Sequence, residues 1–237
     1  MAVSRILGFA RALVACALAV CLPGCAMFGS CMFNCDSERS GTTSLVGFLY
    51  PDGGLPPQDR VAELPVPLTV GLAFLPSAFG SVADAALRES ILTKVRDRFR
   101  ELPYVRDIVI VPDHYLASGG GYESLQQISR LQGIDVFALV SSDQVSHRGE
   151  NDRSFAYLTI VGSYFIRGST NDTHTLLDLA VIEPRARTLV LRAAGTSSLH
   201  DTSTAVEQGA NLRDQQSLGF DAAAERLIVN LEKELET

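Results

Sequence analysis

The sequence predicts a single α/β domain built on a mixed β-sheet, and two patterns along the chain predict it. Between Leu68 and Val140, apolar strand-like runs alternate with amphipathic helical segments. That order produces parallel strands joined by right-handed crossovers. After Val140 the strand-like runs follow one another with short turns between them, as in an antiparallel meander. About three helices are therefore expected to pack on one continuous sheet.

The first part of the domain is expected to read strand, helix, strand, helix, strand. The strand-like runs are residues 68–75, 105–111 and 134–140, and the helices are residues 81–102 and 122–132. Ser81 and Asp84 form a capping-box-like start for the first helix, and Gly133 is expected to cap the second. Apolar residues recur at the spacing of one helical face; they are Leu87, Ile91, Val95, Phe99 and Leu102, then Leu125, Ile128 and Leu131.

The second part of the domain is expected to be the meander and a closing helix. Its strand-like runs are residues 155–166, 175–182 and 188–194, and the closing helix is residues 217–235. A further short strand is predicted at residues 45–50, ahead of a turn rich in proline, aspartate and glycine. The globular domain is therefore assigned to residues 45–237.

Residues 1–24 have the three parts of an export signal. Two arginines and no acidic residue accompany an apolar run at residues 12–22, which leads through Pro23 and Gly24 to Cys25. The run is too short to span a bilayer comfortably as a permanent helix. Residues 22–25 resemble the lipobox of bacterial lipoproteins, which implies cleavage before Cys25 and acylation of its thiol with palmitate-like chains. The alternative is an ordinary secretory signal that is cut after Gly24.

Residues 25–44 are expected to form the lipidated cysteine and a flexible, polar tether. Ala26 follows Cys25 and no aspartate stands at the next position; by resemblance to lipoproteins of bacteria with two membranes, this predicts an outer-membrane anchor facing the periplasm. All five cysteines lie within the first 35 residues, so the body of the domain has no disulfide. In an oxidising compartment Cys31 and Cys35 are expected to form a local disulfide or to stay as free thiols.

The charge of the chain excludes several classes of partner. The whole chain has 20 basic and 27 acidic residues, a net charge of −7. Loss of two arginines with residues 1–24 would bring the charge to −9. An acidic chain without a basic footprint is not expected to bind nucleic acid or to adhere electrostatically to anionic lipid head groups. Membrane attachment is therefore expected to be covalent or hydrophobic.

Few residues suggest catalysis or cofactor binding. The glycines at 119–121 lie between a strand and a helix, but they lack the spacing of a phosphate-binding loop. Asp172 and His174 alternate along a predicted strand and so share a face. They could centre a metal-dependent hydrolase, with His114 or Asp113 as further groups, although metal sites need three or four convergent ligands. Ordinary polar turn residues are the simpler interpretation, and no catalytic, cofactor-binding or metal residue is assigned.

Several short motifs resemble the rhombotarget lipoproteins, over about residues 44–235. The matching segments are residues 111–116, 119–123, 134–136, 141–145, 158–162, 171–175 and 192–197. That family is named for its association with rhombosortases, which are intramembrane proteases that process a C-terminal tail. The resemblance implies a location in the bacterial envelope but carries no activity.

The expected function is that of a non-enzymatic envelope lipoprotein anchored through Cys25. Its domain would bind a protein partner or assist assembly in a rhombosortase-type system, with no cofactor. The alternatives are the metal-dependent hydrolase centred on Asp172 and His174, and a small-ligand module that uses the glycine loop. Metal content and ligand binding separate these three hypotheses.

Overall fold

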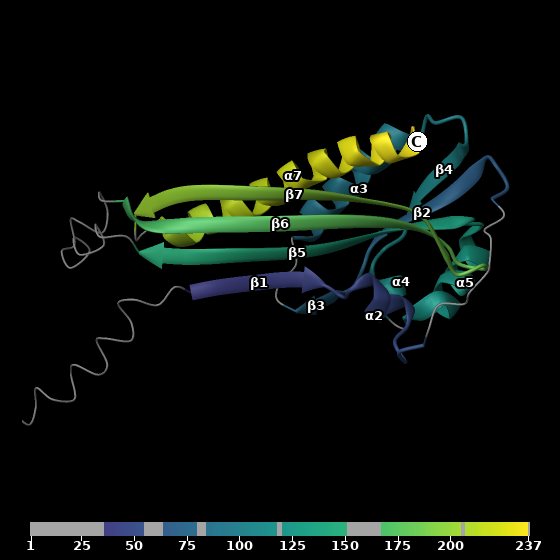
Figure 1. Cartoon of the computed structure of the whole chain (residues 1–237), viewed down its shortest axis with the longest axis horizontal. Coiled ribbons are helices and arrows are strands. Elements are labelled where there is room, and N and C mark those ends of the chain that lie inside the picture. The colour runs from purple at the N-terminus through teal and green to yellow at the C-terminus, as the bar shows by residue number, and fades with distance from the viewer. Residues whose placement is uncertain are drawn as a thin grey trace, which may run out of the picture.

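A mixed sheet of seven strands runs the length of the described part of the molecule and carries helices on both faces (Figure 1). The computed structural model describes residues 36–54, 64–79, 84–117, 120–150, 167–204 and 207–236. The strands are β1 (Asp36–Thr42), β2 (Leu68–Phe74), β3 (Ser77–Phe79), β4 (Val105–Ile110), β5 (Val136–Glu150), β6 (Arg167–Glu183) and β7 (Thr188–Thr204). The helices are α2 (Leu45–Leu49), α3 (Ala85–Phe99), α4 (His114–Ala117), α5 (Gly121–Gln132) and α7 (Gln208–Leu235). The predicted α/β domain on a mixed sheet is confirmed.

Strand β5 is the central strand of the sheet. Along one edge, its first residues pair in parallel with β2, from Val136 to Val140, and its later residues pair antiparallel with β1, from Asp143 to Arg148. Along the other edge it pairs antiparallel with β6 over almost its whole length, and β6 pairs with β7. The sheet therefore has two halves. The α/β half contains β2 and β4; the distal half contains β1, residues 141–150 of β5, 167–178 of β6 and 194–204 of β7.

The α/β half is buried on both faces because successive side chains of a strand point to opposite sides. On β5, Ala138 and Val140 belong to a core with α3 and α7, while Phe137 and Leu139 belong to a second core with α2, α4 and α5. Figure 1 shows α3 and α7 together on one side of the sheet and the three other helices on the opposite side. This burial on both faces explains why the parallel strands are almost continuously apolar.

The distal half is held to α7 by polar contacts. Gln144 Nε2 donates to Thr175 Oγ1 at 2.8 Å and to the carbonyl oxygen of Gln216 at 2.9 Å. Ser197 Oγ donates to the carbonyl oxygen of Gly219 at 2.7 Å. Because buried polar groups are costly unless they are paired, these bonds let strands rich in serine and threonine pack under a helix.

Two predicted elements differ from the structure. Residues 45–50 were expected to be a strand, but α2 forms there because Ser44 Oγ accepts a hydrogen bond from Gly47 N at 3.1 Å and caps the helix. The expected tether includes residues 36–42, which form β1. Its inward side is polar: Thr42 Oγ1 accepts from Ser142 N at 2.9 Å, so no apolar alternation marks this strand.

Other predictions are confirmed in part. The apolar face of α3 is correct, since Ile91, Val95 and Phe99 are buried, and Gly133 caps α5 with a φ of 67°. Leu131 was expected to face inward but is 82% exposed, because repeated steps of three residues drift around a helix of 3.6 residues per turn. Strands β5, β6 and β7 and helix α7 are longer than predicted, and their additional residues are largely polar. The predicted strand at 155–166, Ser81 and residues 1–35 lie outside the described residues.

Gly195 allows α7 to approach β7 at backbone distance. A Cβ atom at this position would lie 2.9 Å from Leu227 Cα and would also overlap the backbone of Ala223. We expect Gly195→Ala to lower the free energy of unfolding by about 2–3 kcal/mol, since neither backbone segment can move without disturbing the core. Denaturant unfolding measures this change. Gly54→Ala is the control, because only Tyr50 Cδ1, at 3.8 Å, lies near that position; equal effects of the two substitutions would contradict the close approach.

Candidate functional site

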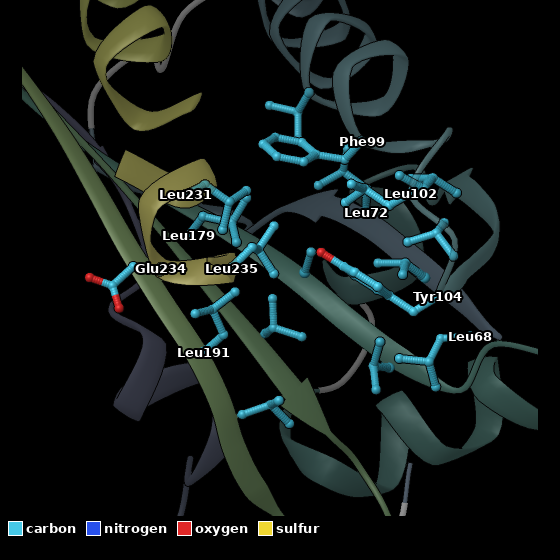
Figure 2. Close-up of a pocket in the computed structure, with 18 of the residues that line it drawn as sticks. Leu68, Leu72, Phe99, Leu102, Tyr104, Leu179, Leu191, Leu231, Glu234 and Leu235 are labelled. Carbon is cyan, nitrogen blue, oxygen red and sulfur yellow. The ribbon is translucent and has the colours of Figure 1, made fainter. Parts of the chain in front are cut away.

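An apolar cavity of about 360 Å³ lies between the α/β half of the sheet and the ends of two helices (Figure 2). Five strands, β2 and β4 to β7, and two helices, α3 and α7, contribute to its lining. The side chains that form most of its wall are Leu68, Leu72, Phe99, Leu179, Leu191 and Leu231. In Figure 2 these side chains surround one space below the last turns of the two helices.

The cavity exists because the sheet extends further than the helices that cover it. α3 ends at Phe99 and α7 at Leu235, whereas β2 and β4 continue to the pair formed by Leu68 and Val105. The floor also includes the small side chain of Ala138, which leaves space that a larger residue would fill. The cavity therefore results from the relative lengths of the elements.

The rim of the cavity contains exposed apolar side chains. Val66 is 67% exposed, Val190 is 41% exposed and Leu235 is 36% exposed, and all three line the cavity. Exposed apolar side chains gathered around a hollow are typical of binding surfaces. A polar hydroxyl is supplied by Tyr104, and Glu234 contributes a carboxylate at the rim.

Glu234 is the only charged side chain among the described residues that line the cavity. Glu234 is exposed and lies in the last turn of α7; Figure 2 shows its carboxylate directed away from the apolar side chains. The C-terminal ends of α3 and α7 both lie at the cavity, and such ends carry partial negative charge. Arg98, in the last turn of α3, forms an ion pair with Glu232. The positive charge of Arg98 is thus already balanced.

The structure separates Asp113 from Asp172 and His174, which the hydrolase hypothesis combined. Asp172 lies on β6 and forms an ion pair with His200 of β7, while His174 lies opposite Val145 and Ser198 in the neighbouring strands. Asp113 lies just before α4 and pairs with Arg88. In the ranges of the chain that the structure describes, no three histidine, cysteine or acidic side chains lie close enough to hold a metal ion.

The side chains of Asp172, His174 and His200 belong to the face of the distal half that lies opposite α7. Residues 171, 173 and 175 of β6 are buried, whereas His174 is exposed and Asp172 is half-buried. His147 lies directly opposite Asp172 on β5. Three of the four histidines in the chain therefore share one surface: His147, His174 and His200. From the sequence, only Asp172 and His174 were predicted to share a face.

The glycine loop leads directly into α5. Gly121 has a φ of 91°, and a Cβ atom on Gly120 would lie 2.9 Å from the carbonyl oxygen of Phe48. The rings of Tyr122 and Tyr50 pack with centroids 5.4 Å apart. Burial, with a further contribution from Tyr50, raises the pKa of Tyr122 above its ordinary value; its hydroxyl donates to the carbonyl oxygen of Arg187 at 3.3 Å. These contacts pack α2 against α5. Gly119 lies outside the described residues.

Sequence reasoning missed the cavity. Its lining comes from seven elements that are distant along the chain, and no short motif contains it. The signal that could have revealed it is the position of apolar residues beyond the expected ends of helices and strands. Val66, two residues before the expected strand at 68–75, is such a residue, but the convergence of the lining residues depends on the fold.

Comparisons with known proteins find distant structural likenesses. No family model matches the chain, and no curated protein matches it. One solved structure, described as a homologue of a neuraminyllactose-binding hemagglutinin from Helicobacter pylori, is 9% identical with a TM-score of 0.40, covering 76% of this chain and 91% of that one. Lipoprotein GNA1162 from Neisseria meningitidis is 10% identical with a TM-score of 0.29, covering 62% and 96%.

A dodecameric PelC variant from Paraburkholderia phytofirmans is 12% identical with a TM-score of 0.31, covering 83% of this chain and 99% of that one. These likenesses are too distant to assign a family or an activity, and the resemblance to the rhombotarget lipoproteins stays a prediction. Across the helices that the structure describes, none combines the length and apolar character needed to cross a bilayer.

Proposed function

We propose that the chain is a lipid-anchored bacterial envelope lipoprotein whose α/β domain binds an apolar ligand in the cavity. The supporting observation is the cavity itself: about 360 Å³ with walls that are almost wholly aliphatic and aromatic. Ligand pockets typically measure about 300–1,000 Å³ and are lined mainly by apolar side chains with a few polar groups. An unfilled apolar space costs packing contacts, which a bound apolar ligand would restore.

Binding can be measured with N-phenyl-1-naphthylamine, an uncharged dye that fluoresces in apolar surroundings. The unlipidated mature chain carrying Cys25→Ala is expected to bind the dye saturably with one site per chain. Ala138→Leu, which places a larger side chain on the cavity floor, is expected to weaken binding by about tenfold or more. A fluorescence titration and its stoichiometry provide the measurement.

Two controls separate loss of the cavity from loss of the fold. Ala138→Leu should keep the unfolding midpoint of the parent chain, because its added volume enters existing space. Ala224→Leu lies in the same core but does not line the cavity, so it should lower stability by about 1–3 kcal/mol. Dye binding that is unaffected in a folded Ala138→Leu chain would exclude the cavity as the binding site.

The proposal includes a lipid anchor on Cys25. Metabolic labelling of cells with an alkyne analogue of palmitate is expected to label the protein, and Cys25→Ala is expected to abolish the label. Cys31→Ala and Cys35→Ala are matched controls, since each removes a nearby thiol and should leave labelling unchanged. Persistent labelling of the Cys25→Ala chain would show that the anchor lies elsewhere or that another residue carries it.

The finer proposal is an outer-membrane location facing the periplasm, with a protein partner in a rhombosortase-type system. It is supported by the lipobox-like segment, by Ala26 after Cys25 and by the motif resemblance. Crosslinking in living cells, followed by capture of the lipidated chain, is expected to recover one envelope protein reproducibly. Recovery of the same proteins with an unrelated outer-membrane lipoprotein would contradict a specific partner.

A further inference from the structure

We infer that the cavity holds one acyl chain of a membrane lipid, of roughly 12–14 carbons, with an uncharged or cationic head group at the rim beside Glu234. This inference rests on the proposed function and names the ligand class of the same site. It combines three observations: the size and lining of the cavity, the charge at its rim, and its position relative to the predicted anchor.

The lining selects a hydrocarbon chain. Apart from the hydroxyl of Tyr104 and the rim carboxylate of Glu234, it consists of aliphatic and aromatic side chains. A ligand with polar groups along its length would leave those groups without hydrogen-bond partners, which is costly in an apolar site. An apolar protein cavity of about 150 Å³ accommodates the six carbons of benzene. On that scale, about 360 Å³ accommodates roughly 14 carbons.

The rim selects the head group by charge. The carboxylate of Glu234 is the only charged side chain among the described lining residues, and the C-terminal ends of α3 and α7, which also lie at the cavity, carry partial negative charge. Arg98, which could attract an anion, is engaged by Glu232. A carboxylate or phosphate at the rim would meet repulsion, whereas a glycerol or an ammonium group would not.

Geometry argues against the chain's own anchor as the occupant. The described chain begins at Asp36, which pairs with Arg148 in the distal half, and the cavity includes Ala138 in the α/β half. Arg148 and Ala138 are ten residues apart on β5, which corresponds to about 33 Å along the strand. The eleven residues from Cys25 to Asp36 can span at most about 40 Å, so an anchor in the cavity would require them to run back along the sheet from the distal half to the α/β half. A free lipid meets no such constraint.

Competition for the bound dye tests the ligand class, with all probes kept below their micelle concentrations. Monolauroylglycerol and dodecylamine are expected to displace the dye from the Cys25→Ala chain more effectively than laurate, by about two- to fivefold. Monodecanoylglycerol, which is two methylenes shorter, is expected to bind about fifteenfold more weakly than monolauroylglycerol. Equal displacement by all four compounds would overturn the inference.

Glu234→Gln provides the matched variant for the head group. It should strengthen laurate binding and weaken dodecylamine binding, because the substitution removes the negative charge at the rim. Glu236→Gln is the control, since Glu236 is exposed two residues further on and does not line the cavity. If neither charged probe responds to Glu234→Gln, the head-group assignment is wrong. Dye binding that persists in that case would leave the proposed function standing.

Native mass spectrometry identifies the source of the acyl chain. The Cys25→Ala chain, purified from the envelope without detergent, is expected to carry a lipid that fragmentation can identify. The contrary result has two parts: the Cys25→Ala chain carries no lipid but binds the dye, and the lipidated chain does not bind the dye. That result would show that the protein's own anchor, and not a membrane lipid, occupies the cavity.

Discussion

The pairing of β5 is the constraint on which the rest of the structure depends. One strand supplies a parallel edge to β2, an antiparallel edge to β1, and a continuous antiparallel edge to β6. Its residues must therefore suit two environments in succession. From Val136 to Val140 both faces are apolar, and from Ser142 onward buried side chains alternate with more exposed ones. Because β5, β6 and β7 continue past the parallel region, α7 needs its 28 residues to cover one face of both halves.

The two halves are held to α7 by different forces. In the α/β half, apolar burial around Phe220 and Leu227 dominates, and it needs no directional match. In the distal half, the side chains of Gln144 and Ser197 donate to the carbonyl oxygens of Gln216 and Gly219, whose positions are fixed by the helix. Apolar burial alone would tolerate sliding of the helix along the sheet, whereas these bonds define its register. Gly195 adds a third restraint, since only a residue without a side chain permits the backbone contact.

The sequence predicts one part of this structure well and another poorly, for a physical reason. Apolar periodicity reports burial against apolar neighbours, so α3, α5, β2 and β4 were predicted close to their observed limits. The distal strands are buried against polar neighbours, and a run such as residues 36–42, with serine and threonine on its inward face, has no apolar alternation to detect. The short apolar run at 45–50 fits a strand or a helix equally well, and the decisive cap by Ser44 is a single hydrogen bond. The cavity could not be predicted, because it arises where helix ends and strand ends fail to coincide.

That mismatch also connects the fold to its proposed role. A longer α3 or α7 would cover the end of the sheet and fill the space with side chains, which would increase packing. Instead, the apolar surface around Val66, Val190 and Leu235 stays accessible, at the end of the sheet opposite the start of β1 (Figure 1). If the lipid on Cys25 anchors the chain in the membrane, the tether joins the domain at its distal half. The cavity opens at the other end of the long strands. A lipid bound there would lie at the opposite end of the long strands from Asp36, where the tether joins the domain.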